Sequence, residues 1–162
     1  MNAPLPSKTA LKDELVRILA SELEVRERAH KAALEGATHE EAKPENDKDT
    51  RALEQSYLAR GEAARVEEMR EGLVAAKAMV VRTFGQGEPV AVGALVATEQ
   101  NGATTVLLLA PSGGGTRLAA GAVQVVTPQS PLGRALLGKR AGDEFELVVA
   151  GRSREIAVLS VD

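Results

Sequence analysis

A short acidic segment near residue 45 is the part of this sequence whose residue types could do chemistry. Its carboxylates are interleaved with two lysines and comprise Glu40, Glu41, Glu45, Asp47 and Asp49. Mg²⁺ prefers oxygen ligands and often takes only one or two of them from a protein. One hypothesis is therefore that this segment offers carboxylates to a metal ion that a partner holds. The alternative is a solvated, capped turn, since Thr38 with Glu41 fits a capping box and Asp47 or Asp49 can cap a following helix.

Two long helical patterns flank this acidic segment. In residues 7–36, apolar residues recur at spacings of three and four, and in residues 49–78 a second set recurs every seven. The first set is Leu11, Leu15, Ile18, Val25, Ala29 and Ala32, and the second is Ala59, Val66, Leu73 and Val80, with Met69 and Ala76 between them. Because the opposite faces are charged, we expect the two stripes to bury each other in an antiparallel coiled-coil hairpin over residues 1–78. Gly36 ends the first helix and Pro44 forbids a continuous one, which places an acidic tip at about residues 37–48.

The sequence after residue 78 changes to patterns typical of strands. Strands are predicted at residues 78–84, 90–98, 104–110, 123–127, 143–150 and 154–161. Asn101-Gly102 predicts a tight hairpin turn, and a second turn is expected around Gly151-Arg152. The only helix signal lies at residues 131–138. We therefore expect a small β-rich domain of the α+β class over residues 79–162, in which an antiparallel sheet covers one short helix.

Composition excludes several classes of function. The chain has no cysteine, which excludes disulfides, thiolate zinc sites and cysteine nucleophiles. Its 20 Lys and Arg against 23 Asp and Glu give a net charge of −3, so it lacks the basic excess that unaided duplex binding requires. No apolar run approaches the roughly 20 residues of a membrane span, and residues 1–8 lack the apolar core of a signal peptide. We expect a cytoplasmic protein that contacts no membrane.

The remaining candidate residues do not combine into a catalytic site. His30 lies on a charged helix and His39 in the acidic segment, with no paired histidine at metal-ligand spacing. Gly113-Gly114-Gly115 lacks the lysine and the following helix that a phosphate-binding loop requires. With so few histidines, no Ser-His-acid set can be chosen. We expect that the chain is not itself an enzyme and has no cofactor of its own.

The most informative block is residues 130–143, which read Ser-Pro-Leu-Gly-Arg-Ala-Leu-Leu-Gly-Lys-Arg-Ala-Gly-Asp. Pro131 opens a turn, one apolar turn of helix follows, and Gly142-Asp143 leads into a strand. At least two of the three leucines, Leu132, Leu136 and Leu137, are expected to pack the helix on the sheet. This order predicts a compact docking element rather than a catalytic motif.

The block closely resembles the final segment of the Gre transcript-cleavage factors of bacterial RNA polymerase. The resemblance extends to the order of a helical hairpin followed by a β-rich domain, to Leu53-Glu54-Gln55 in the second helix, and to Glu45-Asn46 at the tip. Family members carry an Asp, two intervening residues and then Glu-Asn, whereas Ala42 stands at the Asp position here. Residues 113–116 also replace a more acidic loop. The resemblance implies an FKBP-like fold for the C-terminal domain.

The resemblance also implies a function and its site residues. It implies a transcription elongation factor that binds RNA polymerase at the secondary channel, inserts its coiled coil and contacts the RNA and DNA indirectly. By the family's precedent, Ser130, Pro131 and Leu132 lie at the polymerase-contacting surface. Glu45, with Glu41 as the substitute for the missing Asp, would assist catalysis by helping to hold a Mg²⁺ of the polymerase active site, and the polymerase would then hydrolyse backtracked RNA. A helical seam satisfied within one chain argues for a monomer.

Several alternatives remain open at this stage. Within the family, stimulation of cleavage is the leading outcome, and occupancy of the channel without stimulation is the second, because losing a carboxylate weakens a site that must position hydroxide. A prolyl isomerase is suggested by the FKBP-like fold, but the domain offers only Phe84 and Phe145 as aromatic residues for a pocket. A coiled-coil adaptor or chaperone with no polymerase role is the third alternative.

Overall fold

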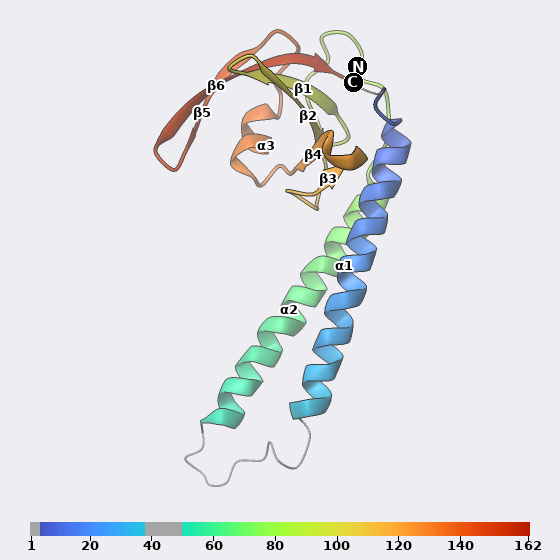
Figure 1. The fold of residues 1–162 in the computed structure, drawn as a ribbon, viewed down its shortest axis with the longest axis vertical. Helices are drawn as coiled ribbons and strands as arrows, with labels where there is room; N and C mark the ends of the chain where they lie inside the picture. Colours follow the sequence, from blue (N-terminus) through green and yellow to red (C-terminus); the bar gives the residue numbers. More distant parts are fainter. Residues whose placement is uncertain (1–3, 38–49) are drawn as a thin grey trace. The chain divides into compact units, whose positions relative to one another are not determined.

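The computed structural model describes residues 4–37 and 50–162. The chain divides into two compact units, Met1–Arg17 with Val74–Asp162, and Ile18–Leu73. The first unit contains a six-stranded sheet and a short helix, and the second contains most of two long helices (Figure 1). The predicted tip carboxylates, Glu41 and Glu45 among them, lie outside the described residues. So do Ala42 and His39.

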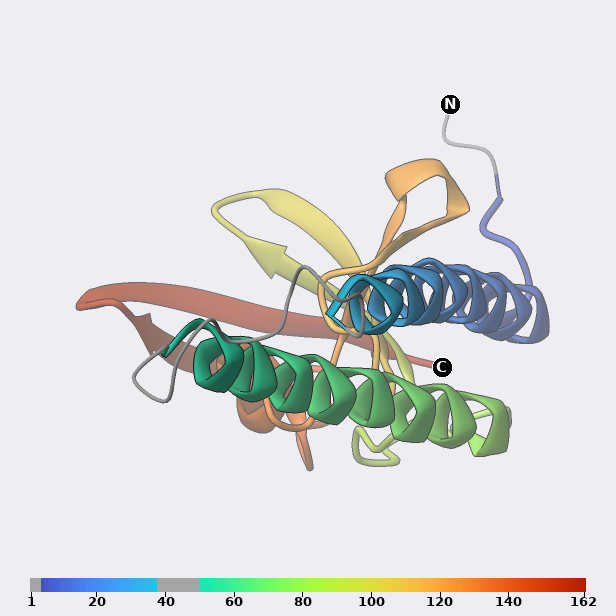
Figure 2. The ribbon, with the colours of Figure 1, turned by 90° about the horizontal axis from the view of Figure 1, so that it is seen from below.

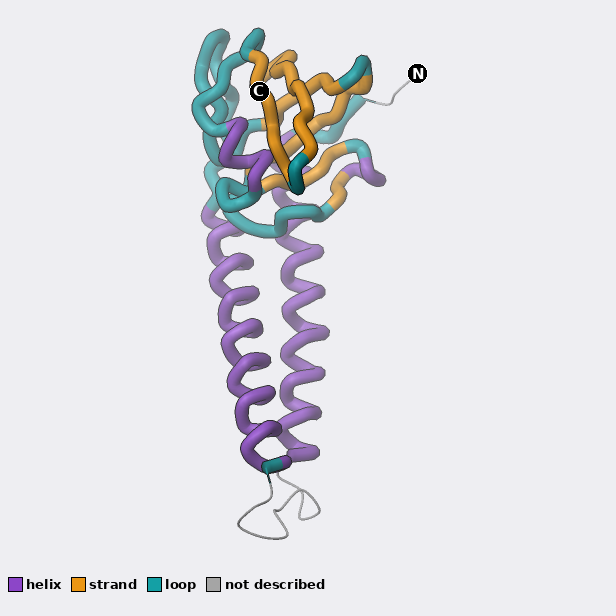
Figure 3. Tube along the Cα trace, turned by 90° about the vertical axis from the view of Figure 1, so that its left-hand side faces the viewer, coloured by secondary structure: helices purple, strands orange, loops and turns teal. Residues whose placement is uncertain are grey.

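The two long helices, α1 (Lys8–Ala37) and α2 (Arg51–Ala78), confirm the helical patterns read from the sequence. Both are rich in Ala, Leu, Glu, Arg and Lys, which have high helix propensity. The side chain of Ser7 caps α1 by accepting a hydrogen bond from the Ala10 N–H at 3.1 Å. Within the second unit the helices run side by side, as Figure 2 and Figure 3 show from two directions.

Ion pairs and apolar contacts join the helices in antiparallel order within the second unit. Arg26 of α1 pairs with Glu62 of α2 at 3.0 Å, and Arg70 of α2 pairs with Glu27 of α1 at 2.9 Å. Each of these side chains keeps more than a third of its surface exposed, so each pair contributes little stability in water. Burial of Leu23 and Val66 is the larger contribution. The antiparallel hairpin predicted from the sequence is therefore present.

The predicted seam of α1 is wrong beyond its middle. Val25 is 65% exposed, and Ala29 and Ala32 are exposed as well. Leu23 is buried instead, at 8% exposure. An α-helix advances about 100° per residue, so positions two apart lie on nearly opposite sides. The break in spacing at Glu22 therefore marks a change of the buried face, which the predicted stripe did not follow.

The beginning of α1 and the end of α2 belong to the same compact unit as the sheet. Lys12 Nζ donates to the Met79 carbonyl at 2.7 Å, and Glu14 Oε2 accepts a hydrogen bond from the Ala119 N–H at 3.0 Å. Leu11, Leu15, Ala76 and Met79 are buried in this unit. The predicted domain boundary after residue 78 coincides with the end of α2, whereas the compact units divide the chain within both helices.

The sheet has the strand order β3-β4-β2-β1-β6-β5. Its strands are β1 (Leu95–Gln100), β2 (Ala103–Leu109), β3 (Arg117–Leu118), β4 (Val123–Val126), β5 (Glu144–Val149) and β6 (Arg152–Val161). Asn101 and Gly102 turn β1 into β2 with φ values of 50° and 76°, which confirms the predicted tight hairpin. Ala150 and Gly151 make the second hairpin in the same way, with φ values of 51° and 73°.

Two features of the sheet differ from the sequence prediction. The sheet is mixed rather than antiparallel, because β2 and β4 pair in parallel. Residues 79–94 form no strand, although strands were predicted at 78–84 and from residue 90. Instead, Val90 exchanges hydrogen bonds with the 138–139 segment, donating to the Lys139 carbonyl at 2.8 Å and accepting from the Gly138 N–H at 2.9 Å. Phe84 and Val90 are nevertheless buried. The apolar pattern of this segment therefore indicates burial in the core and not pairing in the sheet.

The short helix α3 (Pro131–Leu136) covers one face of the sheet (Figure 1). Leu136 is completely buried in a cluster with residues of β1, β2, β4 and β6, namely Val96, Leu107, Leu109, Val126 and Val158. Leu132 and Phe145 pack against this cluster. The predicted order of a helical hairpin followed by an α+β domain with one short helix on its sheet is confirmed.

Leu15 and Leu53 provide a matched test of helix burial. Leu15 is fully buried and Leu53 is 56% exposed. Replacing Leu15 with Ala should lower the free energy of unfolding by about 2–5 kcal/mol, because a buried side chain leaves a cavity. Leu53→Ala removes the same atoms from the surface and should change it by less than about 0.5 kcal/mol. Urea denaturation followed by circular dichroism measures both. Equal losses would contradict the assigned burial.

Candidate docking surface

Ser130 caps the turn that leads into α3. Its Oγ accepts a hydrogen bond from the Gly133 N–H at 3.0 Å and donates one to the Thr127 carbonyl at 2.9 Å. Its backbone N–H donates to the same carbonyl at 3.0 Å. Pro131 occupies the first helical position, where no backbone N–H is needed, and its side chain is exposed. The turn is therefore fixed by hydrogen bonds beneath it and presents Pro131 outward.

Gly133 makes this turn sterically possible. A Cβ atom at this position would lie 1.8 Å from the Thr127 carbonyl oxygen and 2.6 Å from its carbon. Both are backbone atoms, so no side-chain rotation could relieve the clash. Gly133 lies within the block of residues 130–143, but no role was predicted for it from the sequence. The Ser-Pro-x-Gly spacing was the available signal, but the close approach becomes visible only in the fold.

The three residues predicted to contact a partner differ in exposure. Pro131 is exposed, whereas Ser130 and Leu132 are half-buried, and Leu132 also packs against the core. Leu136 is fully buried and Leu137 is 39% exposed, which agrees with the expectation that at least two of the three leucines pack inward. Gln129 and Arg134 are exposed beside Pro131 in the sequence. The accessible part of the candidate docking surface thus centres on Pro131, and its role in binding stays a prediction.

Hydrogen bonds also hold the C-terminal end of residues 130–143. Arg140 Nη1 donates to the Gly87 carbonyl, and Asp143 Oδ2 accepts a hydrogen bond from the Arg140 N–H at 2.7 Å. The Asp143 carbonyl in turn accepts from the Val158 N–H of β6 at 2.8 Å. Residues 130–143 are therefore held to the 85–90 loop and to the sheet, and these hydrogen bonds support the segment that carries the Pro131 turn.

Charged groups in the supporting loop neutralise one another. Glu88 Oε2 accepts a hydrogen bond from the Gly85 N–H at 2.8 Å, and Glu88 pairs with Arg82 at 2.5 Å. The hydrogen bond from Gly85, followed by the one from Arg82, holds the pKa of Glu88 below its ordinary value. The Arg82 guanidinium carbon lies 3.9 Å from the centre of the Phe84 ring, a distance typical of a cation–π contact. These charges stabilise the loop internally.

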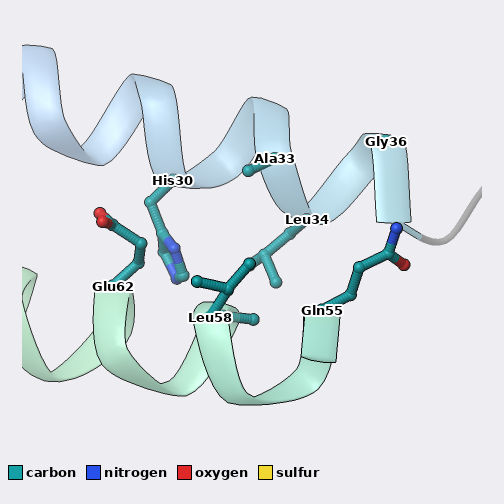
Figure 4. A pocket seen from close by; sticks show the side chains of 8 residues that line it. His30, Ala33, Leu34, Gly36, Gln55, Leu58 and Glu62 are labelled. Carbon is teal, nitrogen blue, oxygen red and sulfur yellow. The ribbon is translucent and has the colours of Figure 1, made fainter. Parts of the chain in front are cut away.

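A hollow between the long helices offers no catalytic set. It encloses about 320 Å³ and is lined by residues of both helices, among them His30, Leu34, Leu58 and Glu62 (Figure 4). His30 Nδ1 is buried there without a hydrogen-bond partner. Among residues 4–37 and 50–162, no group of three or more His, Asp and Glu side chains could hold a metal ion. No helix in this part of the chain has the length and apolarity to cross a membrane.

The described residues thus combine two long helices with a sheet domain that carries the exposed Pro131 turn. Residues 87–162 match the family model described as transcription elongation factor, GreA/GreB, C-term. This match covers all of residues 130–143 and most of the sheet domain. Residues 87–162 are therefore similar to the C-terminal domain of the GreA/GreB elongation factors, in agreement with the resemblance found in the sequence.

Solved structures of Gre-type proteins are also similar to this chain. GreA factor homolog 1 of Thermus thermophilus has 21% identity, with 91% of this chain and 94% of that chain covered and a TM-score of 0.40. A structure of the transcription factor Gfh1 has 24% identity over 99% of both chains, with a TM-score of 0.40. A GreA/GreB elongation factor from Nitrosomonas europaea has 18% identity over 59% of this chain and 78% of that chain, with a TM-score of 0.39. No curated protein matched the chain.

Substitution of Gly133 tests the steric basis of the docking turn. Gly133→Ala should lower the free energy of unfolding by more than about 2 kcal/mol, because backbone must move to accommodate the new methyl group. Gly61 on α2 is the matched control, since a Cβ there meets nothing within 4 Å. Gly61→Ala should raise stability by up to about 1 kcal/mol through helix propensity. Urea titrations measure the free energy of unfolding of both variants. If Gly133→Ala leaves this free energy unchanged, the close approach is absent in solution.

Proposed function

We propose that the protein is a cytoplasmic elongation factor that binds RNA polymerase through the Pro131 turn and inserts its helical hairpin into the secondary channel. The observation that carries this proposal is the Gre-family match over residues 87–162, which contains an exposed proline on a rigidly supported turn. Proline presents an apolar surface with little side-chain freedom, so little conformational entropy is lost on binding. The protein would act as a monomer and meet RNA and DNA only through the polymerase.

The hairpin supplies the route by which carboxylates would reach the polymerase active site. The helices α1 and α2 are antiparallel, and the chain between Ala37 and Arg51 connects them. Glu41 and Glu45 belong to this connection. In the proposal, these two carboxylates donate oxygen ligands to a Mg²⁺ that the polymerase already holds by its own residues. The polymerase performs the hydrolysis, and this protein is not itself an enzyme.

Ala42 favours a second candidate function within the same family. The Gre pattern places an Asp at this position, and the side chain of Ala42 has no oxygen that could bind a metal ion. If Glu41 does not substitute for it, the second metal ion is held too weakly to position a hydroxide. The protein would then occupy the channel and regulate the polymerase without stimulating cleavage. Both versions require docking through the C-terminal domain, so binding and cleavage must be measured separately.

A charge at Pro131 should disrupt docking without unfolding the domain. Pro131→Glu places a carboxylate at the centre of the exposed turn, where burying it against a partner costs free energy. We expect at least about a tenfold loss of affinity for RNA polymerase, equivalent to about 1.4 kcal/mol, in a fluorescence-anisotropy titration. Gln86→Glu adds the same charge at another exposed turn of this domain and should bind normally. Unchanged affinity of the Pro131 variant would remove this turn from the interface.

The tip residues decide between stimulation and occupancy. On one stalled, backtracked transcription complex, Glu45→Ala should abolish stimulated cleavage while affinity for the polymerase is retained. Ala42→Asp should increase the cleavage rate, because it restores a carboxylate to the metal-directed set. Glu68→Ala removes an exposed carboxylate from α2 and serves as the control.

The outcomes of this series are distinct. An inactive natural chain that gains cleavage with Ala42→Asp would identify a channel-occupying regulator. Cleavage by Glu45→Ala at the rate of the natural chain would contradict the metal-directed role of Glu45.

A further inference from the structure

The two edges of the six-stranded sheet differ in their protection against another strand. One edge strand, β3, has only two residues, and a very short edge strand is a common protection. The other, β5, has six residues, contains no proline or lysine, and pairs with β6 without a bulge. Figure 1 shows β5 on the outer side of the β5–β6 hairpin. An additional strand can therefore pair at β5.

The hydrogen-bond pattern determines which β5 groups are available. The Val158 N–H donates to the Asp143 carbonyl at 2.8 Å, and Glu144 lies opposite Ala157. In an antiparallel ladder this makes Glu144 and every second residue after it positions that do not bond to β6. The N–H and C=O groups of Glu144, Glu146 and Val148 consequently point outward. Among the described residues outside β6, none of these groups has a backbone partner.

The side chains along this edge specify the kind of strand that fits. Glu144, Glu146 and Val148 are exposed on one face of the sheet, and Val148 is 62% exposed. Glu155 of β6 lies directly opposite Glu146. Like charges in opposite positions destabilise a sheet, whereas opposite charges stabilise it. A strand added beyond β5 is therefore most favourable when it carries basic residues opposite the two glutamates of β5.

We propose that the β5 edge binds an extended, basic segment of a partner protein, which adds to the sheet as a further strand. Its Lys or Arg side chains would pair with Glu144 and Glu146, and an uncharged side chain would cover Val148. In this mode the backbone hydrogen bonds provide affinity and the alternate side chains provide specificity. The site is separate in sequence from the Pro131 turn, so it does not depend on the proposed polymerase contact.

A second copy of this chain fits the edge less well. For two β5 strands to pair antiparallel through their outward groups, Glu146 must face Glu146 or Glu144 or Val148 of the other copy. The first two registers oppose carboxylates directly, and the third leaves Glu144 beyond the end of the partner's β5. Repulsion between the opposed carboxylates therefore disfavours pairing of two copies and favours a partner with basic residues.

A designed peptide and two sets of variants test the proposal. The probe is the capped peptide Thr-Val-Thr-Val-Lys-Val-Lys-Thr, which places its lysines opposite Glu146 and Glu144 when it pairs antiparallel. In an NMR titration we expect saturable shifts and slowed hydrogen exchange at the Glu146 and Val148 amides. Val148→Pro removes one outward N–H but no β5–β6 hydrogen bond, and should weaken binding at least about tenfold, or about 1.4 kcal/mol.

A charge exchange keeps the test decisive if Val148→Pro disturbs the fold. The double variant Glu144→Lys, Glu146→Lys should lose the lysine peptide and gain the matching peptide in which Glu replaces each Lys. Binding of the lysine peptide with no protection of β5 amides, or equal binding by the natural chain and the double variant, would overturn the proposal. Protection of the β5 edge that rises with protein concentration in the absence of peptide would also overturn it, in favour of self-pairing.

Discussion

The close approach of Gly133 to the Thr127 carbonyl is the constraint on which the Pro131 turn depends. The carbonyl accepts hydrogen bonds from both the backbone and the side chain of Ser130, and the N–H of Gly133 completes the set by donating to Ser130 Oγ. A methyl group at residue 133 would lie 1.8 Å from the carbonyl oxygen of Thr127 and would clash with it. The conformation is thus fixed by backbone sterics and by hydrogen bonds beneath the turn. Pro131 has no N–H to donate to this set, and its side chain is exposed.

The rest of the domain extends this support in both directions. Leu136, one turn of helix beyond Gly133, is buried in the apolar cluster of the sheet and fixes α3 against it. Beyond α3, the chain pairs with Val90 and then joins β6 through Asp143. The pairing with Val90 and with β6 satisfies backbone groups, and such groups are costly to leave unsatisfied. The Pro131 turn is therefore connected to the sheet both by apolar packing and by backbone hydrogen bonds.

Much of the fold could be predicted from the sequence because the signals were local. Asn101-Gly102 specifies a tight hairpin through backbone preferences of two residues, and Ser130-Pro131 specifies a helix start in the same way. The parallel pairing of β2 with β4 was missed because no local signal encodes which strands become neighbours. Residues 79–94 were misread because Phe84 and Val90 fill the core while the backbone of Val90 pairs with the 138–139 loop and not with a strand. The buried face of α1 was misread beyond Glu22, where the regular spacing of apolar residues breaks and Leu23 is buried in place of Val25.

The candidate site was predictable in part for the same reason. The motif at residues 130–132 predicted a docking turn, whose binding role stays a prediction. Burial had to be seen before the exposed Pro131 could be separated from the half-buried Ser130 and Leu132. The role of Gly133 depends on Thr127, whose carbonyl is brought close only by the fold. The open β5 edge could not be predicted from the sequence for a related reason. Which strand lies at an edge follows from the order of the strands, and this order comes from the fold.

In the function proposed above, the Pro131 turn is the part of this protein that touches RNA polymerase. Site-specific photo-crosslinking tests it most directly, with a photoreactive amino acid in place of Pro131 in one chain and in place of Gln86 in another. We expect a crosslink to a polymerase subunit from position 131, which the unmodified chain competes away, and little or none from position 86. Binding of the labelled chain without a crosslink from position 131, or an equal yield from both positions, would contradict it.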